Sequence, residues 1–465
     1  MTFTSLSFFV FFIVVLVIYW LLKKRERQNL FLLLASYVFY FYFDLLFGFL
    51  MLVSSAVDYV LARGMTNHPD RRKMYLWLSL ALNVGGLAVM RHFGFFAESV
   101  NLLFGILGLH VNAALLAPLG ISFYTLKKLS YIVDVYKGKE KPSDSFVDFA
   151  LYVAFFPQIQ AGPIDRARNL LAQIKSQREW KADWFHAAWP LVVSGLFKKL
   201  VIATGIGAYV DRIFLLDKPG SILMVLAGSV AYALQILADF SAYTDLSRGF
   251  ALLLGFTTPE NFNQPYTALT PTDFWNRWHI TLSQWLRDYV FFPLRRGLLR
   301  AGGAAASLAA IVPPLMVMLV SGLWHGDGWT FLLWGVMHGI WIVAYQLLGM
   351  GGAWQPKNFL TKAAAWLAVM AFLVASWTVF RAPSLGWLWE SFTEAPLLGS
   401  RDHLIVVLIT LSAASFYGML WNLKAIAEKL WQRAPMLEPL YYAAAAVMTI
   451  IYANPGLQDF IYFRF

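Results

Sequence analysis

The sequence predicts an all-α protein that crosses a membrane many times. Of its 465 residues, 59% are hydrophobic and only 14% are charged, whereas soluble globular chains have about 45–50% and about 25%. A water-soluble fold could not hide so much apolar surface. The apolar residues also gather in runs that approach the roughly 20 residues a spanning helix needs. These observations exclude a soluble multidomain enzyme, a coiled coil and a disordered chain.

Eleven apolar runs are candidates for spanning helices, and a twelfth run is weaker. The strong runs cover residues 6–22, 29–43, 45–62, 75–96, 186–206, 222–240, 305–323, 329–349, 363–380, 403–421 and 437–453. The weak run covers 113–133, where Lys127 and Lys128 interrupt it. We therefore expect about 11–12 transmembrane helices.

The segment after the weak run is expected to differ from a simple loop. Its apolar stretch, 146–156, is too short to span a membrane, and a turn bounded by Pro157 and Pro163 follows it. Irregular backbone at membrane depth is tolerated only where protein buries it or where it lines a cavity. We expect re-entrant or interfacial structure around a cavity over 113–165. No internal repeat or long linker divides the chain, which predicts one domain over 1–465.

The charge pattern follows membrane topology. The 37 Lys and Arg outnumber the 26 Asp and Glu, but they lie in short clusters between apolar runs, as the positive-inside rule produces. We therefore expect no nucleic-acid partner. The first basic cluster, 23–27, follows the first apolar run, which indicates an anchored helix rather than a cleaved signal peptide. The absence of cysteine excludes disulfides and Cys-ligated metals.

One aromatic, amphipathic segment is a candidate site. Residues 270–273 are typical of a helix start, with a Thr cap followed by Pro and, at the third position, Asp. We expect one continuous helix from there to Asp288, with Trp275, Trp278 and His279 on a shared face. An interfacial helix with an aromatic belt would show this pattern. A helix that presents His279 into a polar cavity walled by the tryptophans would show it as well.

A second candidate lies at 321–330, a segment that joins two apolar runs and holds three glycines, two tryptophans and His325. An ionisable residue at membrane depth is a functional candidate by default. Neutral imidazole can take a hydroxyl proton near neutral pH, so His325 is a candidate general base. A histidine hydrogen-bonded at a helix end is the structural alternative. For His338 we expect a packed, hydrogen-bonded role. For Asp239 and Asp245, both a structural role, such as pairing of Asp245 with Arg248, and a proton relay stay open.

Several motifs occur in order along nearly the whole chain, at 118–124, 130–136, 155–164, 239–245, 259–263, 274–279, 323–326 and 460–463. Together they resemble the membrane-bound O-acyltransferase (MBOAT) family, in its bacterial alginate O-acetylation branch. The resemblance implies a ring of membrane helices around a central tunnel. An acyl donor would enter this tunnel from the cytoplasm and a hydroxyl acceptor from the other side.

The resemblance also implies roles for individual residues. His325 matches the essential histidine of the family, and His279 matches its second polar position. On the family's usual account, His325 deprotonates the attacking hydroxyl, while His279 orients or polarises a reacting group. We expect further tunnel residues at Trp275, Trp278, Asn276, Trp324, Asp239 and Tyr243.

For function, the resemblance implies a bacterial inner-membrane enzyme that moves acetyl from acetyl-CoA for O-acetylation of an exported or cell-wall polysaccharide. A periplasmic or extracellular hydrolase-like O-acetyltransferase would be its partner, and no permanently bound cofactor or metal is expected. Teichoic-acid D-alanyl transfer stays open, as does a transporter or scaffold of an export complex. A transporter would predict paired repeats, which the sequence lacks, and a scaffold would not need the two histidines.

Overall fold

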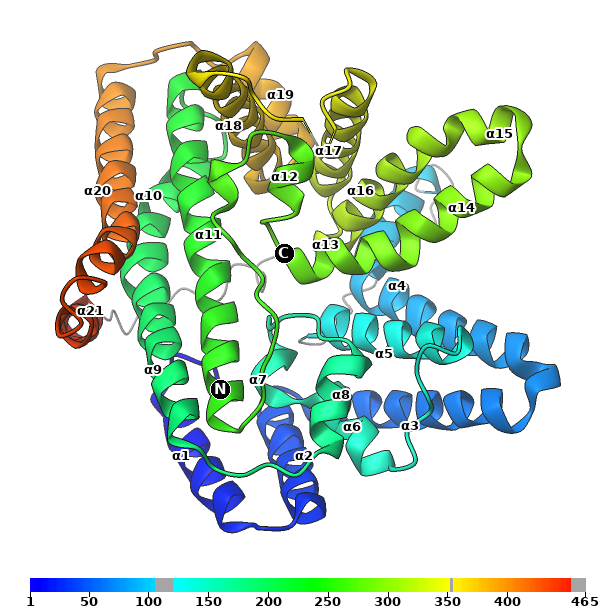
Figure 1. Ribbon diagram of the computed structural model, residues 1–465. Helices are drawn as coiled ribbons and strands as arrows, with labels where there is room; N and C mark the ends of the chain where they lie inside the picture. The colour runs from blue at the N-terminus through cyan, green and yellow to red at the C-terminus, as the bar shows by residue number, and fades with distance from the viewer. Residues whose placement is uncertain (105–119, 352–353, 453–465) are drawn as a thin grey trace. The chain divides into compact units, whose positions relative to one another are not determined.

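The computed structural model, described for residues 1–104, 120–351 and 354–452, consists of helices and contains no strand in these ranges (Figure 1). The predicted all-α class is confirmed. The chain divides into two compact units, and the expected single domain stays a prediction. Unit 1 comprises Met1–Val192 and Tyr243–Pro259, and unit 2 comprises Val193–Ala242 and Glu260–Phe465. Two helices, α9 (Ala182–Phe197) and α11 (Ile222–Leu253), run from one unit into the other.

Within the described ranges, seven helices are long and apolar enough to cross a membrane. They are Leu45–Asn67, Pro69–Arg91, Ala182–Phe214, Ile222–Leu253, Trp329–Leu347, Phe359–Arg381 and Arg401–Trp431. The pair Gly303–Ala310 and Val312–His325, bent by 54°, would make an eighth. The apolar runs are helical, as expected, and the chain is a multi-pass membrane protein. The count lies below the expected 11–12 because some apolar runs form helices that are too short to be included among the seven. One of these is α1, with 16 residues.

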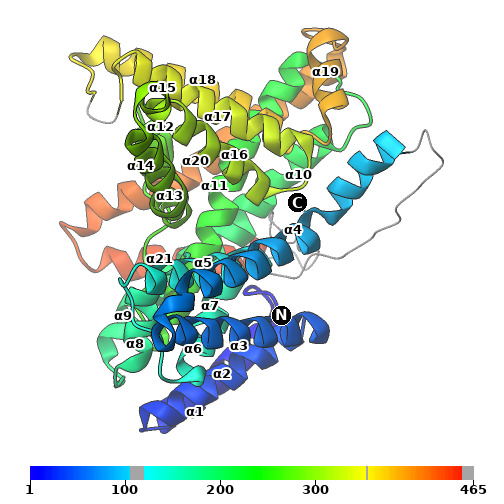
Figure 2. The same ribbon diagram turned by 90° about the vertical axis from the view of Figure 1, so that its right-hand side faces the viewer.

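Unit 1 is built from helices near the N-terminus. They are α1 (Leu6–Leu21), α2 (Arg25–Phe41), α3 (Leu45–Asn67), η1 (Pro69–Arg71), α4 (Arg72–Phe104), α5 (Ile121–Tyr136), α6 (Phe146–Ala154), α7 (Phe156–Ile159) and α8 (Ala167–Lys175). Helices α3, α4 and α5 pack side by side (Figure 2). Rings from separate segments, among them Phe8, Phe39, Phe156 and Phe250, form an aromatic core.

The backbone around α7 is irregular and buried, as expected for the described part of 113–165. Gly120 begins α5 with a φ of 70°, and a Cβ there would lie 2.2 Å from the carbonyl oxygen of Ile159. Glycine is required because it avoids this clash and adopts positive φ without strain. Residues 105–119, which include part of the weak run, lie outside the described residues.

Unit 2 holds the remaining helices. They are η3 (Lys198–Ala203), α10 (Thr204–Phe214), η4 (Pro265–Thr267), α12 (Pro271–Trp275), α13 (Ile280–Leu286), η5 (Arg287–Phe291), α14 (Phe292–Ala301), α15 (Gly303–Ser307), η6 (Leu308–Ala310), α16 (Val312–His325), α17 (Trp329–Leu347), α18 (Phe359–Arg381), α19 (Leu385–Thr393), α20 (Arg401–Trp431) and α21 (Leu437–Tyr452).

Helices α16 and α17 form the closest packed pair of unit 2 (Figure 1). A Cβ at Gly322 would lie 2.4 Å from the carbonyl oxygen of Phe331, and one at Gly335 would lie 2.4 Å from that of Met318. These glycines let the two backbones touch. The end of α16, which carries His325, is therefore packed closely against the start of α17.

Candidate active site

The first candidate segment begins as the sequence predicts but does not continue as one helix. The Thr270 hydroxyl accepts a hydrogen bond from the backbone N–H of Asp273 at 3.1 Å and caps α12. Helix α12 ends at Trp275, however, and α13 begins only at Ile280. The expected continuous helix to Asp288 is therefore wrong. The break falls at His279, whose φ of 41° lies in the left-handed region that a non-glycine residue rarely adopts.

Long-range hydrogen bonds to the segment before η4 explain this break. The backbone N–H of Ile280 donates to the carbonyl of Asn261 at 3.0 Å, and that of Asn263 donates to the carbonyl of Arg277 at 3.0 Å. The side chain of Asn261 also accepts from the backbone N–H of Thr281 at 3.1 Å. These bonds replace intrahelical ones, so the turn around His279 stays satisfied without a helix.

His279 is completely buried at this turn. Its ring centroid lies 4.7 Å from that of Phe240 and 5.6 Å from that of Trp324. Its Nδ1 lies 3.2 Å from Oδ1 of Asn261. His279 lies outside the candidate spans, and burial lowers the pKa of His279 from 6.5 to about 3. The imidazole is therefore neutral at physiological pH.

His325 is the last residue of α16 and is also buried, with 1% of its surface exposed. Its ring centroid lies 4.9 Å from that of Trp324, 5.1 Å from that of Trp334 and 5.4 Å from that of Phe380. Trp324 thus contacts both candidate histidines. The structure therefore brings together two histidines that lie far apart in the sequence, and the same tryptophan, Trp324, packs against both.

A third histidine, His338, lies on α17 in the same aromatic cluster. Its ring centroid lies 4.6 Å from that of Trp334 and 5.3 Å from that of Trp275. The expected packed role is observed. The expected hydrogen bond is not, because neither ring nitrogen has a partner within the described part of the chain. Trp334, which contacts His325, His338 and Trp275, was not singled out from the sequence.

The other predicted tunnel residues in and just after α12 have different surroundings. Trp275 is buried against Trp334. Trp278 stacks on Phe274 and packs at a tilt against Trp377. Asn276 is exposed at the end of α12. It borders a cavity of about 220 Å³. The lining of this cavity includes Trp275, Asn276, Gln284, Arg287 and Gln346.

Asp239 and Tyr243 occupy two different settings. Asp239 forms a buried ion pair with Lys199 at 2.8 Å, a structural contact with a partner that the sequence did not indicate. Tyr243 belongs to unit 1, where its ring centroid lies 6.0 Å from that of Phe3. The assignment of either residue to a substrate tunnel stays a prediction.

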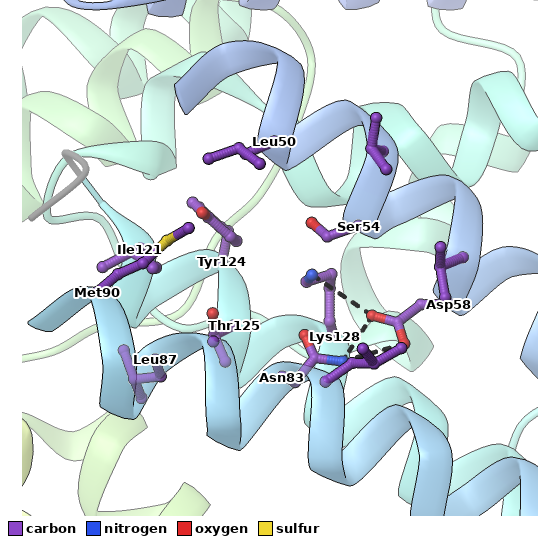
Figure 3. A pocket seen from close by; sticks show the side chains of 14 residues that line it. Leu50, Ser54, Asp58, Asn83, Leu87, Met90, Ile121, Tyr124, Thr125 and Lys128 are labelled. Atoms are coloured by element: carbon purple, nitrogen blue, oxygen red, sulfur yellow. Dashed lines mark hydrogen bonds and ion pairs between the residues drawn. The ribbon is translucent and has the colours of Figure 1, made fainter. Parts of the chain in front are cut away.

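Unit 1 contains a second buried polar site, at one end of a largely apolar cavity of about 230 Å³ (Figure 3). The ammonium of Lys128 lies 3.4 Å from the carboxylate of Asp58. Ser79 and Asn83 donate to the same carboxylate. Leu50, Leu87, Met90 and Ile121 line the apolar remainder. In the sequence, Lys128 stands out only as an interruption of a weak apolar run, and no local signal distinguishes Asp58.

The neighbouring lysine is also satisfied by protein groups. Lys127 donates to the side-chain oxygen of Gln158 at 2.9 Å. Gln158 in turn donates to Asp165, which also accepts from Asn169 at 2.8 Å. Both lysines that interrupt the weak run are therefore buried in protein rather than exposed to lipid, which is the condition for charge at membrane depth.

Fold and site together define a multi-pass membrane protein in which two buried histidines, His279 and His325, pack against the same side chain, Trp324. The family model of the membrane-bound O-acyltransferase family, MBOAT, matches residues 142–386. The "Probable alginate O-acetylase AlgI" of Pseudomonas aeruginosa is 35% identical over 364 residues, which cover 77% of this chain and 67% of that protein. The peptidoglycan O-acetyltransferase of Helicobacter pylori is 33% identical over 382 residues, covering 75% and 70%.

A more distant relative is the teichoic acid D-alanyltransferase of Bacillus subtilis, 28% identical over 274 residues, which cover 57% of this chain and 67% of that protein. The family match spans the turn at His279 and the end of α16 at His325. This chain belongs to the membrane-bound O-acyltransferase family and is an O-acyltransferase.

Proposed function

We propose that this enzyme moves an acetyl group from cytoplasmic acetyl-CoA across the bacterial inner membrane for O-acetylation of an exported or cell-wall polysaccharide. The observation that carries the proposal is the pair His279 and His325, both buried and both packed against Trp324. The names of the AlgI and peptidoglycan O-acetyltransferase relatives support acetyl as the acyl group and a polysaccharide as the acceptor.

In the proposed reaction, the acceptor hydroxyl attacks the carbonyl carbon of the thioester. A ring nitrogen of His325 takes the hydroxyl proton while the new O–C bond forms. The C–S bond then breaks, and the leaving CoA thiolate recovers that proton, which yields the acetyl ester and free CoA. The aromatic rings around His325 support this role because they keep water away from the thioester.

The proposed transfer to the polysaccharide also requires a partner protein. A polysaccharide modified after export lies outside the cytoplasm, so a periplasmic or extracellular hydrolase-like O-acetyltransferase would complete the transfer. Purified enzyme in vesicles, supplied with acetyl-CoA on the cytoplasmic side, would then acetylate the glycan only when this partner is present. Equal acetylation without the partner would contradict this part of the proposal.

A transfer assay in vesicles tests the main proposal. Acetyl-CoA labelled in the acetyl group should yield ester-linked label on the acceptor side. Label that crosses without covalent transfer would instead indicate a transporter. Transfer from a D-alanyl carrier protein, without transfer from acetyl-CoA, would indicate teichoic-acid modification. Either of these results would overturn the proposal.

A further inference from the structure

The side chain of Asn261 has one possible orientation. Asn261 is buried, and its Oδ1 accepts hydrogen bonds from the backbone N–H of Thr281 at 3.1 Å and from the Thr281 hydroxyl at 2.9 Å. A backbone N–H can only donate, so an oxygen must face it. A flipped amide would place its own NH₂ group against this donor. The hydrogen-bond network therefore fixes which end of the amide is the oxygen.

This orientation determines where His279 carries its hydrogen. Nδ1 of His279 lies 3.2 Å from the same Oδ1 of Asn261. An amide oxygen can only accept, so Nδ1 must be the protonated nitrogen. In a neutral imidazole the other nitrogen then holds the lone pair. That nitrogen, Nε2, is buried and has no hydrogen-bond partner among the described residues.

Asn261 also holds the backbone on which His279 sits. Its carbonyl accepts from the N–H of Ile280 at 3.0 Å. His279 adopts a φ of 41°, a conformation that persists in a non-glycine residue only when its surroundings impose it. One asparagine therefore holds both the ring and the strained turn of His279. Phe240 and Trp324 pack on the ring and limit its rotation.

We propose that Asn261 is a positioning residue for acyl transfer, which holds His279 with hydrogen on Nδ1 and presents Nε2 as a hydrogen-bond acceptor. The role of this nitrogen in the reaction rests on the proposed function. A neutral His279 in this tautomer cannot donate from Nε2 to the thioester carbonyl, so it does not polarise that carbonyl. It accepts a hydrogen bond from a neighbouring hydroxyl of the acceptor and so orients the attacking oxygen, whose own proton goes to His325. Of the two roles that the family resemblance implies for His279, the geometry selects orientation.

The tautomer can be measured without any substrate. Full-length protein carrying ¹⁵N-labelled histidine rings, reconstituted in lipid nanodiscs, is compared by NMR with a His279→Gln variant to assign the His279 signals. We expect a neutral ring with hydrogen on Nδ1 and none on Nε2. The Asn261→Leu variant should shift the population toward hydrogen on Nε2. A wild-type ring with hydrogen on Nε2, or a charged ring, would overturn the inference.

Turnover then tests the positioning role. Asn261→Leu should lower kcat for acetyl transfer by about 10²-fold, the loss that a small misplacement of a reacting group causes. Asn261→Asp keeps an acceptor oxygen toward Nδ1 and should retain most of kcat. Its negative charge favours imidazolium, so the His279 ring should take up its second proton at a higher pH than in wild type, which the ¹⁵N signals report. Thr281→Val removes only the hydroxyl bond and should leave this titration unchanged.

These measurements separate the two proposals. The predicted tautomer without transfer from acetyl-CoA would overturn the proposed function but leave the placement of the hydrogen intact. Transfer with an unchanged tautomer and unchanged kcat in Asn261→Leu would overturn the role of Asn261 alone. If Asn261→Leu fails to fold, the ¹⁵N titration of the His279 ring in Asn261→Asp decides, because a ring that takes up its second proton at the wild-type pH contradicts contact between Asn261 and His279.

Discussion

The two buried polar sites of this enzyme accommodate polar side chains inside the protein in opposite ways. In unit 1, the Lys128 ammonium faces the Asp58 carboxylate, and further hydrogen bonds satisfy that carboxylate. In unit 2, His279 and His325 pack against aromatic rings. A buried charge is tolerated only with a partner, whereas an imidazole can be buried as a neutral group. We therefore expect the ion pair to serve the fold and the two histidines to serve the proposed reaction.

The largest expected effect is on activity, at the histidine site. Replacing His325 with Ala should lower the rate of acetyl transfer by about 10²–10⁴-fold, the contribution of a positioned general base. The abundance of the protein in the membrane should stay close to wild type. The matched control is His186→Ala, because His186 is an exposed histidine on α9. Full acetyl transfer by folded His325→Ala protein would show that the reaction does not need His325.

The next effect is on stability, at the ion pair. Asp58→Ala leaves the Lys128 ammonium buried without its counter-charge, which costs about 3–5 kcal/mol. We expect a lower unfolding temperature in detergent and less protein in the membrane. Asp70→Ala is the control, because Asp70 is exposed and its removal should change stability by no more than about 0.5 kcal/mol. Equal stability of the two variants would show that the ion pair does not hold the fold.

A smaller effect is expected where α16 meets α17. Gly322→Ala would push a Cβ against the carbonyl of Phe331, and overpacking of this kind costs about 1–3 kcal/mol. Because His325 ends α16, transfer should fall together with stability. Gly297→Ala is the control, since a Cβ there meets nothing within 4 Å. Unchanged unfolding of Gly322→Ala would show that the helices can separate freely.

The smallest effect is expected at the cap of α12. Thr270→Ala removes the acceptor of the Asp273 N–H and should cost about 1 kcal/mol of unfolding free energy. Thr270→Ser keeps the hydroxyl and should recover most of the loss. Equal stability of the Ala and Ser variants would show that the cap contributes nothing.

The comparison also shows what local sequence can predict. The helix start at Thr270 and the apolar runs were predictable because capping and hydrophobic patterning are local signals. The break at His279 was not, because it depends on Asn261, 18 residues earlier. The burial of Lys128 was missed for the same reason, since its partner Asp58 lies on another helix. Contacts between distant segments decide both sites.

The central claim is that the Asp58–Lys128 ion pair serves the fold, whereas His325 serves acetyl transfer. The most direct test measures acetyl transfer and unfolding of two variants in parallel. Asp58→Leu/Lys128→Met replaces the ion pair with apolar groups, a change that is often neutral or stabilising. His325→Gln removes the proposed base. The double variant should fold and keep acetyl transfer near the wild-type rate, while folded His325→Gln should lose it. Transfer lost in the folded double variant and retained in His325→Gln would contradict this division.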